Sequence, residues 1–234
     1  MLVEKPKNDK QLAESNPSNI FDLFIDLQQV LFCPTLHHSS VFYQCQLSNY
    51  NLDIHDAPSN NAFMMLWNET VAKRGAIEIS SCLLRYAKEH FQPLQTGERR
   101  QLIIWSDRCV GQNNNWRMIT TLKLLVDLNY FTEVHQKFLS TGHSFLPCDR
   151  DFSLIEKKKK TMKVFVPLKW MEVIANARES KPFYVLYMQR EDFKNLRDLE
   201  KALHRNPKFK LTESLWNKIS SKDPNTLFTR EINS

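Results

Sequence analysis

The chain has 234 residues, of which 42% are hydrophobic and 25% are charged, so it is long enough to bury one complete core. Its low glycine content, four residues, excludes a fibrous or low-complexity protein, and no apolar run is long enough to cross a bilayer. Five cysteines without CxxC pairs fit free thiols in a reducing compartment, so we expect an intracellular protein.

The net charge of +6 is concentrated in the last third of the chain. Residues 1–156 hold 14 Lys and Arg against 17 Asp and Glu, a net charge of −3, whereas residues 157–234 hold 18 against 9, a net charge of +9. A basic segment beside an acidic one predicts a polyanionic partner, although a solvated basic surface gives the same counts.

The first predicted strand follows a polar segment, residues 1–19, that we expect to be disordered. The run IFDLFIDLQQVLF, residues 20–32, alternates as a strand does and places Asp26 on the face of Phe24 and Gln28. A carboxylate among apolar neighbours is costly unless it is exposed, hydrogen-bonded or bound to a cation. Asp26 is therefore a candidate site residue.

The following segments alternate between strand and helix patterns. Strands are predicted at residues 41–56, 61–69, 101–107 and 134–139, and helices at residues 76–91, 116–130 and 147–160. The order βββαβαβα predicts a mixed five-stranded sheet flanked by helices over residues 20–160. Residues 161–234 are predicted to be a basic α/β extension that either enlarges the sheet or forms an appendage, with strands at residues 162–166 and 183–188 and helices at residues 168–178 and 191–205.

Several acids lie where these elements end or begin. Asp107 ends the fourth strand, at the sheet edge where ligands collect in open α/β sheets. In the third helix, Asp149 and Glu156 are seven residues apart and point the same way, whereas Asp151 points toward solvent. Asp26, Asp107 and either Asp149 or Glu156 are thus expected to converge. A divalent cation or proton sharing relieves their repulsion, and hard oxygen ligands suit Mg²⁺ or Mn²⁺.

Other polar residues have a structural interpretation beside a functional one. Glu78 is either an acid favoured by the start of its helix or a catalytic acid. The side-chain amides of residues 112–115, among them Gln112 and Asn113, either cap the next helix or contact phosphate or bases. The lysines at positions 157–160 either are solvated at a helix end or contact phosphate: Lys157, Lys158, Lys159 and Lys160. No zinc site is predicted, because Cys109, His143 and Cys148 match no standard ligand spacing.

Several strings of the chain resemble a poorly characterised domain family of invertebrate mobile elements over roughly residues 21–193. They are LDIHD, LWNET, KRGAIEISSCLL, WSDRCVGQNNN, GHSFLPCDRDFSLIEKKKK, VFVPLKWMEVI and KPFYVLYMQREDF. The order of the elements and acids also resembles the RNase H-like fold of DDE/D transposases, integrases and related nucleases.

The resemblance implies a metal-dependent enzyme that hydrolyses or joins DNA phosphodiester bonds with two Mg²⁺ or Mn²⁺ ions. Asp26 and Asp107 would bridge the ions, Asp149 or Glu156 would be the final acid, and Glu78 stands where ribonuclease H enzymes keep a further glutamate. DNA as the partner implies a nuclear protein. The resemblance implies no small-molecule cofactor, and it is compatible with an oligomer. The alternative is a catalytically inactive remnant that binds DNA or protein. Because no DNA-binding module precedes Ile20, we expect a fragment of a longer element or a domain adapted by its host.

Overall fold

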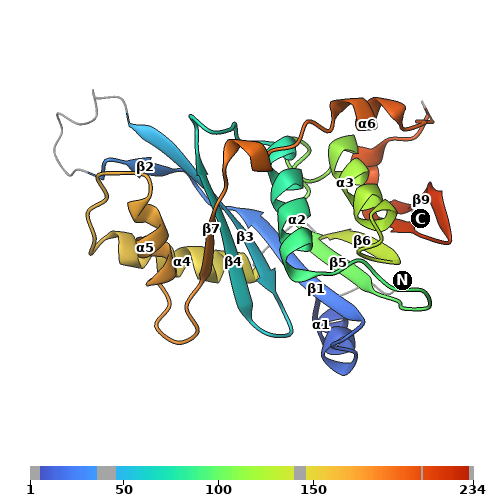
Figure 1. Cartoon of the computed structure of the whole chain (residues 1–234), viewed down its shortest axis with the longest axis horizontal. Helices are drawn as coiled ribbons and strands as arrows, with labels where there is room; N and C mark the ends of the chain where they lie inside the picture. Colours follow the sequence, from blue (N-terminus) through green and yellow to red (C-terminus); the bar gives the residue numbers. More distant parts are fainter. Residues whose placement is uncertain (1–5, 36–45, 140–145, 207, 232–234) are drawn as a thin grey trace.

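The centre of the molecule is a nine-stranded mixed sheet (Figure 1). The computed structural model describes residues 6–35, 46–139, 146–206 and 208–231. The strands are β1 (Ile20–Leu27), β2 (Leu31–Cys33), β3 (Leu47–Asp56), β4 (Asn61–Asn68), β5 (Gln101–Ser106), β6 (Glu133–Phe138), β7 (Tyr184–Tyr187), β8 (Ser214–Ser220) and β9 (Asp223–Glu231). Their order along the sheet is β7-β4-β3-β1-β5-β6-β8-β9, and β2 pairs with β3.

Strand β1 lies in the middle of this sheet and shows the alternation that its sequence predicts. Leu23 and Ile25 are fully buried on one face, and Phe24 and Asp26 lie on the other. β1 runs antiparallel to β3 and parallel to β5, which is in turn parallel to β6. In the register of β1 with β3, Asp26 lies opposite Asp53, so these two acids share one face of the sheet.

Helices cover both faces of the sheet (Figure 1). One face packs against α2 (Ala76–His90) and α3 (Trp116–Asp127), whose apolar residues form the main core with those of β1, β3 and β5. The other face packs against α4 (Pro147–Lys159) and α5 (Lys169–Ala175), where Ile155 and Trp170 contact a second core that includes Met64. Asp26 of β1 and Asp53 of β3 therefore lie on the face that α4 covers.

The predicted α/β class is confirmed, but the sheet is larger than the five strands expected. β7 pairs in parallel with β4, and β8 and β9 continue the sheet beyond β6. These additions cover the backbone groups that the edges of a five-stranded sheet would expose. Residues 161–234 therefore enlarge the sheet on both sides, and the expected boundary near residue 160 does not interrupt it.

Two predicted elements of the C-terminal part differ from the structure. Residues 162–166 form no strand, because the backbone of Val164 bonds to Thr35 instead of joining the sheet. The single helix predicted at residues 191–205 is divided into the 3-10 turn η2 (Arg190–Asp192) and α6 (Arg197–Ala202). A further 3-10 turn, η3 (Leu211–Glu213), precedes β8.

The N-terminal segment that we expected to be disordered contains helix α1 (Pro6–Ser15). Asp9 on this helix accepts hydrogen bonds from Trp105 Nε1 at 3.1 Å and from Lys137 Nζ at 2.9 Å. Those partners lie about a hundred residues away in the sequence, so local composition gave no sign of them. Residues 1–5 and the first part of the strand predicted at residues 41–56 lie outside the described residues. Within the described residues, no helix is long and apolar enough to cross a membrane.

Removing residues 206–234 is expected to prevent cooperative folding, because β8 covers the edge of β6 and because Leu211 and Ile219 belong to the main core. Thermal melting followed by circular dichroism would measure the effect. A truncated chain that melts cooperatively at the temperature of the full chain would show instead that this segment is a separable appendage.

Candidate functional site

An open groove of about 470 Å³ lies where β1 ends beneath α4. Its lining is mostly polar and comes from residues 26–29 and from one side of α4: Asp26, Leu27, Gln28, Gln29, Asp149, Phe152, Ser153, Glu156, Lys157 and Lys160. Two acidic residues of the helix thus face the acid of the strand, as the seven-residue spacing predicts. Acids and lysines line the same groove.

Asp26 is the acid at the centre of this site. It is the penultimate residue of β1, and its carboxylate accepts a hydrogen bond of 2.8 Å from the backbone N–H of Leu27. Its pKa is raised to about 6, mainly by burial and also by the negative charges of Asp107 and Asp149, whereas the Leu27 hydrogen bond and Arg74 act in the opposite direction. Three acids from separate elements therefore interact electrostatically.

Asp107 is held in place at the end of β5. Its Oδ1 accepts hydrogen bonds from the side chain of Asn113 and from the backbone N–H of Cys109, at 3.3 Å in the second case. Asn113 is in turn fixed, because its backbone carbonyl accepts a hydrogen bond of 2.8 Å from Gln136 Nε2. The turn after β5 thus holds the Asp107 carboxylate, which does not line the groove but whose charge acts on Asp26.

The two candidates for the final acid, which the sequence left open, differ in their surroundings. Asp149 lies in the first turn of α4, accepts a hydrogen bond of 2.8 Å from the backbone N–H of Leu146, and contributes to the raised pKa of Asp26. Glu156 accepts a hydrogen bond of 3.1 Å from Gln28 and pairs with Lys159 at 3.0 Å, which offsets its charge. Asp149 is therefore the better partner for Asp26, although both acids line the groove.

The structure does not bring Glu78 into this group. Glu78 is buried in the first turn of α2, which covers the opposite face of the sheet from α4. Among the described residues, no contact links its carboxylate to Asp26, Asp107 or Asp149. Its position fits the alternative interpretation of an acid at the start of a helix.

Some of the residues predicted to contact nucleic acid lie at the groove, and others are buried or already paired. Lys157 and Lys160 line the groove, while Lys159 pairs with Glu156. Asn113 is only 2% exposed and bonds to Asp107, so its position fits a structural role and does not fit a contact with DNA. The helix cap that we considered for this segment is Asn115, which accepts a hydrogen bond of 3.0 Å from the N–H of Met118.

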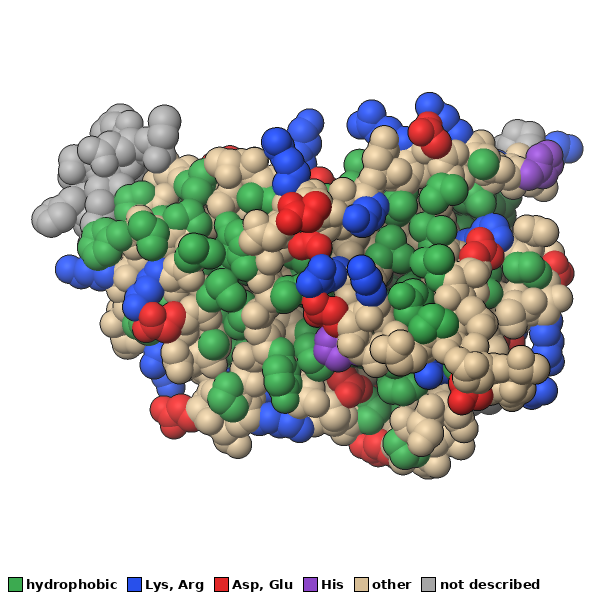
Figure 2. All heavy atoms as spheres, in the orientation of Figure 1, with side chains coloured by type: hydrophobic (Ala, Val, Ile, Leu, Met, Phe, Trp, Pro, Cys, Tyr) green, Lys and Arg blue, Asp and Glu red, His purple; other side chains and the backbone are tan. Residues whose placement is uncertain are grey.

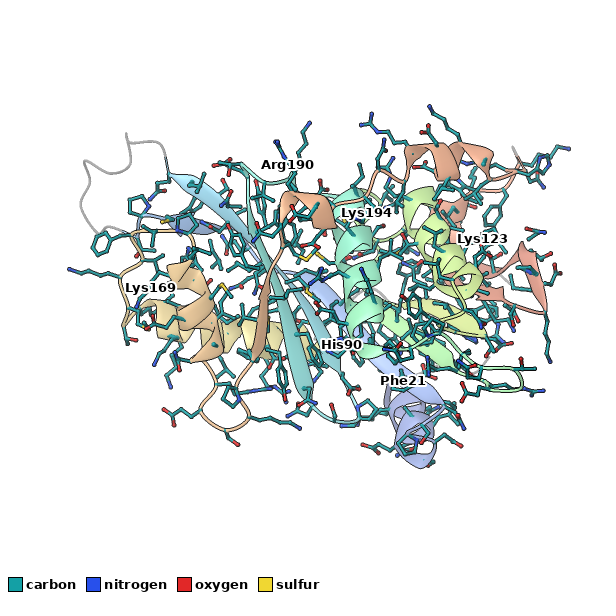
Figure 3. All side chains as sticks on the ribbon, viewed as in Figure 1. Phe21, His90, Lys123, Lys169, Arg190 and Lys194 are labelled. Carbon is teal, nitrogen blue, oxygen red and sulfur yellow. The ribbon has the colours of Figure 1, made fainter. Side chains whose placement is uncertain are left out.

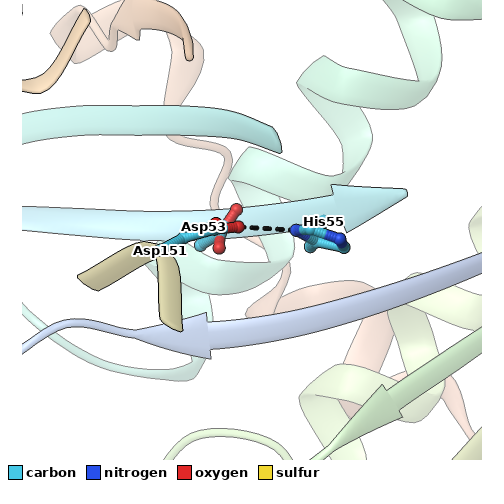
Figure 4. Close-up of side chains that lie close together, drawn as sticks. All are labelled: Asp53, His55 and Asp151. Carbon is cyan, nitrogen blue, oxygen red and sulfur yellow. Dashed lines mark hydrogen bonds and ion pairs between the residues drawn. The ribbon is translucent and has the colours of Figure 1, made fainter. Parts of the chain in front are cut away.

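A second cluster, formed by Asp53, His55 and Asp151, lies beneath α4 and was missed in the sequence (Figure 4). The prediction that Asp151 faces solvent is wrong, because its side chain is fully buried with His55 Nδ1 2.6 Å from its Oδ2. The buried stripe of α4 runs through Cys148, Asp151 and Ile155, so a charged residue occupies a core position. The available signal was the alternation in LDIHD, which puts Asp53 and His55 on one face.

The second cluster and the acids around Asp26 differ in the distances between their side chains. Asp53, His55 and Asp151 each offer a ligand atom, and these atoms lie within 4.8 Å of one another. Among the described residues, no other group of three potential ligands is this close, so Asp26, Asp107 and Asp149 are more widely spaced.

Of the three residues whose spacing matched no zinc site, Cys109 is exposed, Cys148 is buried, and His143 lies outside the described residues.

The basic charge of the C-terminal part is distributed over the molecule. Figure 2 shows the face that carries α2 and α3, where positive and negative side chains are mixed. Arg190 and Lys194 lie close to α2, whereas Lys169 lies at a distant end of the molecule (Figure 3). The net charge of this segment therefore does not produce a single basic patch on this face.

Residues 54–232 match the model of the DUF7869 family, which is described as a domain of unknown function. The matched range includes Asp107 and Asp149 but begins within β3, after Asp26. No curated protein and no solved structure was found to match the chain.

Asp26→Asn is expected to stabilise the metal-free protein above about pH 6. The Asp26 carboxyl titrates near 3.8 in an unfolded chain and at about 6 in the fold, so the free energy of unfolding falls as pH rises between these values. Asparagine carries no charge and can still accept the hydrogen bond from Leu27. Thermal melting in EDTA at several pH values should show the difference appear through this window and then stay constant.

Asp198→Asn is the matched control, because the Asp198 side chain is 87% exposed and its charge is screened by solvent. If Asp26→Asn melts at a lower temperature than the wild type at pH 7, burial and repulsion do not disfavour the charged form of Asp26, and its pKa is not raised.

Proposed function

The chain belongs to the DUF7869 family, and we propose that it is an RNase H-like domain that cuts or joins DNA phosphodiester bonds with divalent metal ions. The observation that carries this proposal is the state of Asp26. Burial and the charges of Asp107 and Asp149 raise its pKa to about 6. Carboxylates that repel one another in an open polar groove are typical of sites that bind cations.

The arrangement of the central strands supports the same proposal. Strands β4, β3, β1, β5 and β6 are adjacent in that order, with β3 antiparallel to both neighbours and β1, β5 and β6 parallel. The three acids lie on the central strand, after its parallel neighbour, and on the helix that follows the next strand. This is the placement that a resemblance to RNase H-like enzymes implies.

The donor set fits Mg²⁺ or Mn²⁺, because Asp26, Asp107 and Asp149 supply only hard oxygen ligands. When bound there, two such ions would activate a water or a DNA 3′-hydroxyl and stabilise the leaving oxygen. The turn after β5 holds the Asp107 carboxylate, and the first turn of α4 holds that of Asp149. Lys157 and Lys160 add positive charge to the groove, which favours the binding of phosphates.

The test of this function is a nicking assay with supercoiled DNA and the purified chain in Mg²⁺ or Mn²⁺. Asp26→Asn and Asp107→Asn should each lower the rate by about 100-fold or more, because each removes a ligand that contributes several kcal/mol of charge stabilisation. Asp198→Asn, on the exposed surface of α6, should retain the wild-type rate. Equal nicking by the wild type and by both site variants would refute the proposed nuclease activity of this site.

The same assay decides the final acid. Asp149→Asn should lower the rate as strongly as Asp26→Asn, whereas Glu156→Gln should have a smaller effect, since Lys159 already offsets the charge of Glu156. The reverse order would assign Glu156 as the ligand.

Lys157→Ala together with Lys160→Ala should weaken DNA binding and lower the slope of log affinity against log salt by about 2, because each phosphate contact releases about one counterion. Fluorescence anisotropy with labelled DNA at several salt concentrations measures this slope. Lys169→Ala is the control, because Lys169 pairs with Glu172 on α5 and lies outside the groove. An unchanged slope in the double variant would exclude these lysines from the DNA contact.

A catalytically inactive DNA- or protein-binding domain is the second candidate. Its support is that Asp107 and Asp149 already accept hydrogen bonds from neighbouring groups and that the three acids are not gathered within 4.8 Å. This candidate predicts binding to DNA without nicking in any divalent metal. It also predicts that Asp26→Asn leaves that binding unchanged.

A further inference from the structure

We propose that Asp53, His55 and Asp151 form a closed, structural metal site for a Zn²⁺-like divalent ion, separate from the groove of Asp26. Strand alternation puts Asp53 and His55 on the face of β3 that α4 covers, and α4 turns Asp151 toward them (Figure 4). Their ligand atoms all lie within 4.8 Å of one another. Two elements far apart in the sequence thus present three donors to one point.

The site is enclosed, with exposed fractions of 0% for Asp53, 2% for His55 and 0% for Asp151. Neither carboxylate oxygen of Asp53 accepts a hydrogen bond of ordinary geometry in the part of the chain that the structure describes. The side chains that interact with it are the Cys148 thiol, a weak donor, and the Asp151 carboxyl, whose charge opposes its own. A buried carboxylate without such partners is costly. The unsatisfied oxygens of Asp53 point to a ligand that the protein itself does not supply.

The neighbouring charges leave Asp53 uncompensated. Arg178 Nη1 and Arg150 Nε lie 3.6 Å and 3.8 Å from Asp151 Oδ1, and His55 pairs with the other oxygen of Asp151. These cations face Asp151, whereas the residue opposite Asp53 on β1 is another acid, Asp26. A divalent cation would neutralise the two carboxylates of the cluster.

The donor chemistry selects the kind of ion. Mg²⁺ prefers oxygen ligands and keeps several waters, which an enclosed site containing imidazole does not favour. Zn²⁺ accepts imidazole and carboxylate ligands, and its structural sites are closed and four-coordinate. The free thiol of Cys148 is buried next to Asp53 and is the nearest further donor of the kind that Zn²⁺ binds.

A metal at this position would stabilise the fold by linking α4 to β3. α4 carries Asp149, so the link would also fix the helix that lines the groove. Because binding to the folded state alone raises stability, the consequence is measurable without any assay of activity. The inference therefore does not depend on the proposed nuclease function.

The experiment uses the full chain, stripped of metal, loaded with Zn²⁺ and dialysed to remove the excess. The wild type should retain one ion per chain by mass spectrometry and melt at a higher temperature than the stripped protein. His55→Gln and Asp53→Asn should weaken Zn²⁺ binding at least about 100-fold and abolish the rise in melting temperature. Asp198→Asn, on the exposed surface of α6, should retain the ion.

Circular dichroism identifies the variants that fold. Retention of the ion by folded His55→Gln, or a stripped and reloaded wild type that holds no ion, overturns the proposal. If neither site variant folds, anomalous diffraction from Zn²⁺-soaked wild-type crystals decides it. A peak bonded to Asp53, His55 and Asp151 supports the site, and no peak among these side chains refutes it.

Discussion

Strand β1 pairs with β3 on one side and with β5 on the other, and these pairings position Asp26, Asp53 and the strand that ends before Asp107. Alternation along β1 directs Leu23 and Ile25 into the main core and leaves Asp22, Phe24 and Asp26 on the face beneath α1 and α4. Because pairing with β3 adds Asp53 and His55 to the same face, the sheet gathers several carboxylates under one helix layer. The rest of the structure must compensate that charge.

The negative charge of these carboxylates is compensated differently at different points along β1. Near its start, Asp22 is fully buried and its pKa is raised to about 8, mainly by burial and by the charge of Asp9, while Lys137 acts in the opposite direction. In the middle, arginines and His55 surround Asp151 but leave Asp53 without a partner. At the end of the strand, Asp26 and Asp149 line an open groove, and the charge of Asp107 also acts on Asp26. The open groove is the part to which the proposed catalysis is assigned, whereas the enclosed group is the proposed structural metal site.

Much of the acidic groove was predictable because its signals are local. The alternation of residues 20–27 put Asp26 on the face opposite the main core, and the abrupt end of an apolar strand marked Asp107. Helical spacing put Asp149 and Glu156 on one side of α4. The same reasoning failed for Asp151, since a charged residue on a helix is ordinarily solvated, and for Asn113, whose buried amide bonds to Asp107. Glu78 was assigned by resemblance alone, and α2 carries it on the other face.

The sequence by itself determined the α/β class, most elements of residues 20–160 and the facing of side chains along each element, because these follow from periodicities of two and of 3.6 residues. Only the tertiary structure decided which faces meet. The register that sets Asp26 opposite Asp53, the docking of α4 that buries Asp151, and the addition of β7, β8 and β9 to the sheet all depend on contacts between distant segments. Such contacts are selected by the packing of the whole core and by the need to pair exposed strand edges, which no short stretch of sequence contains.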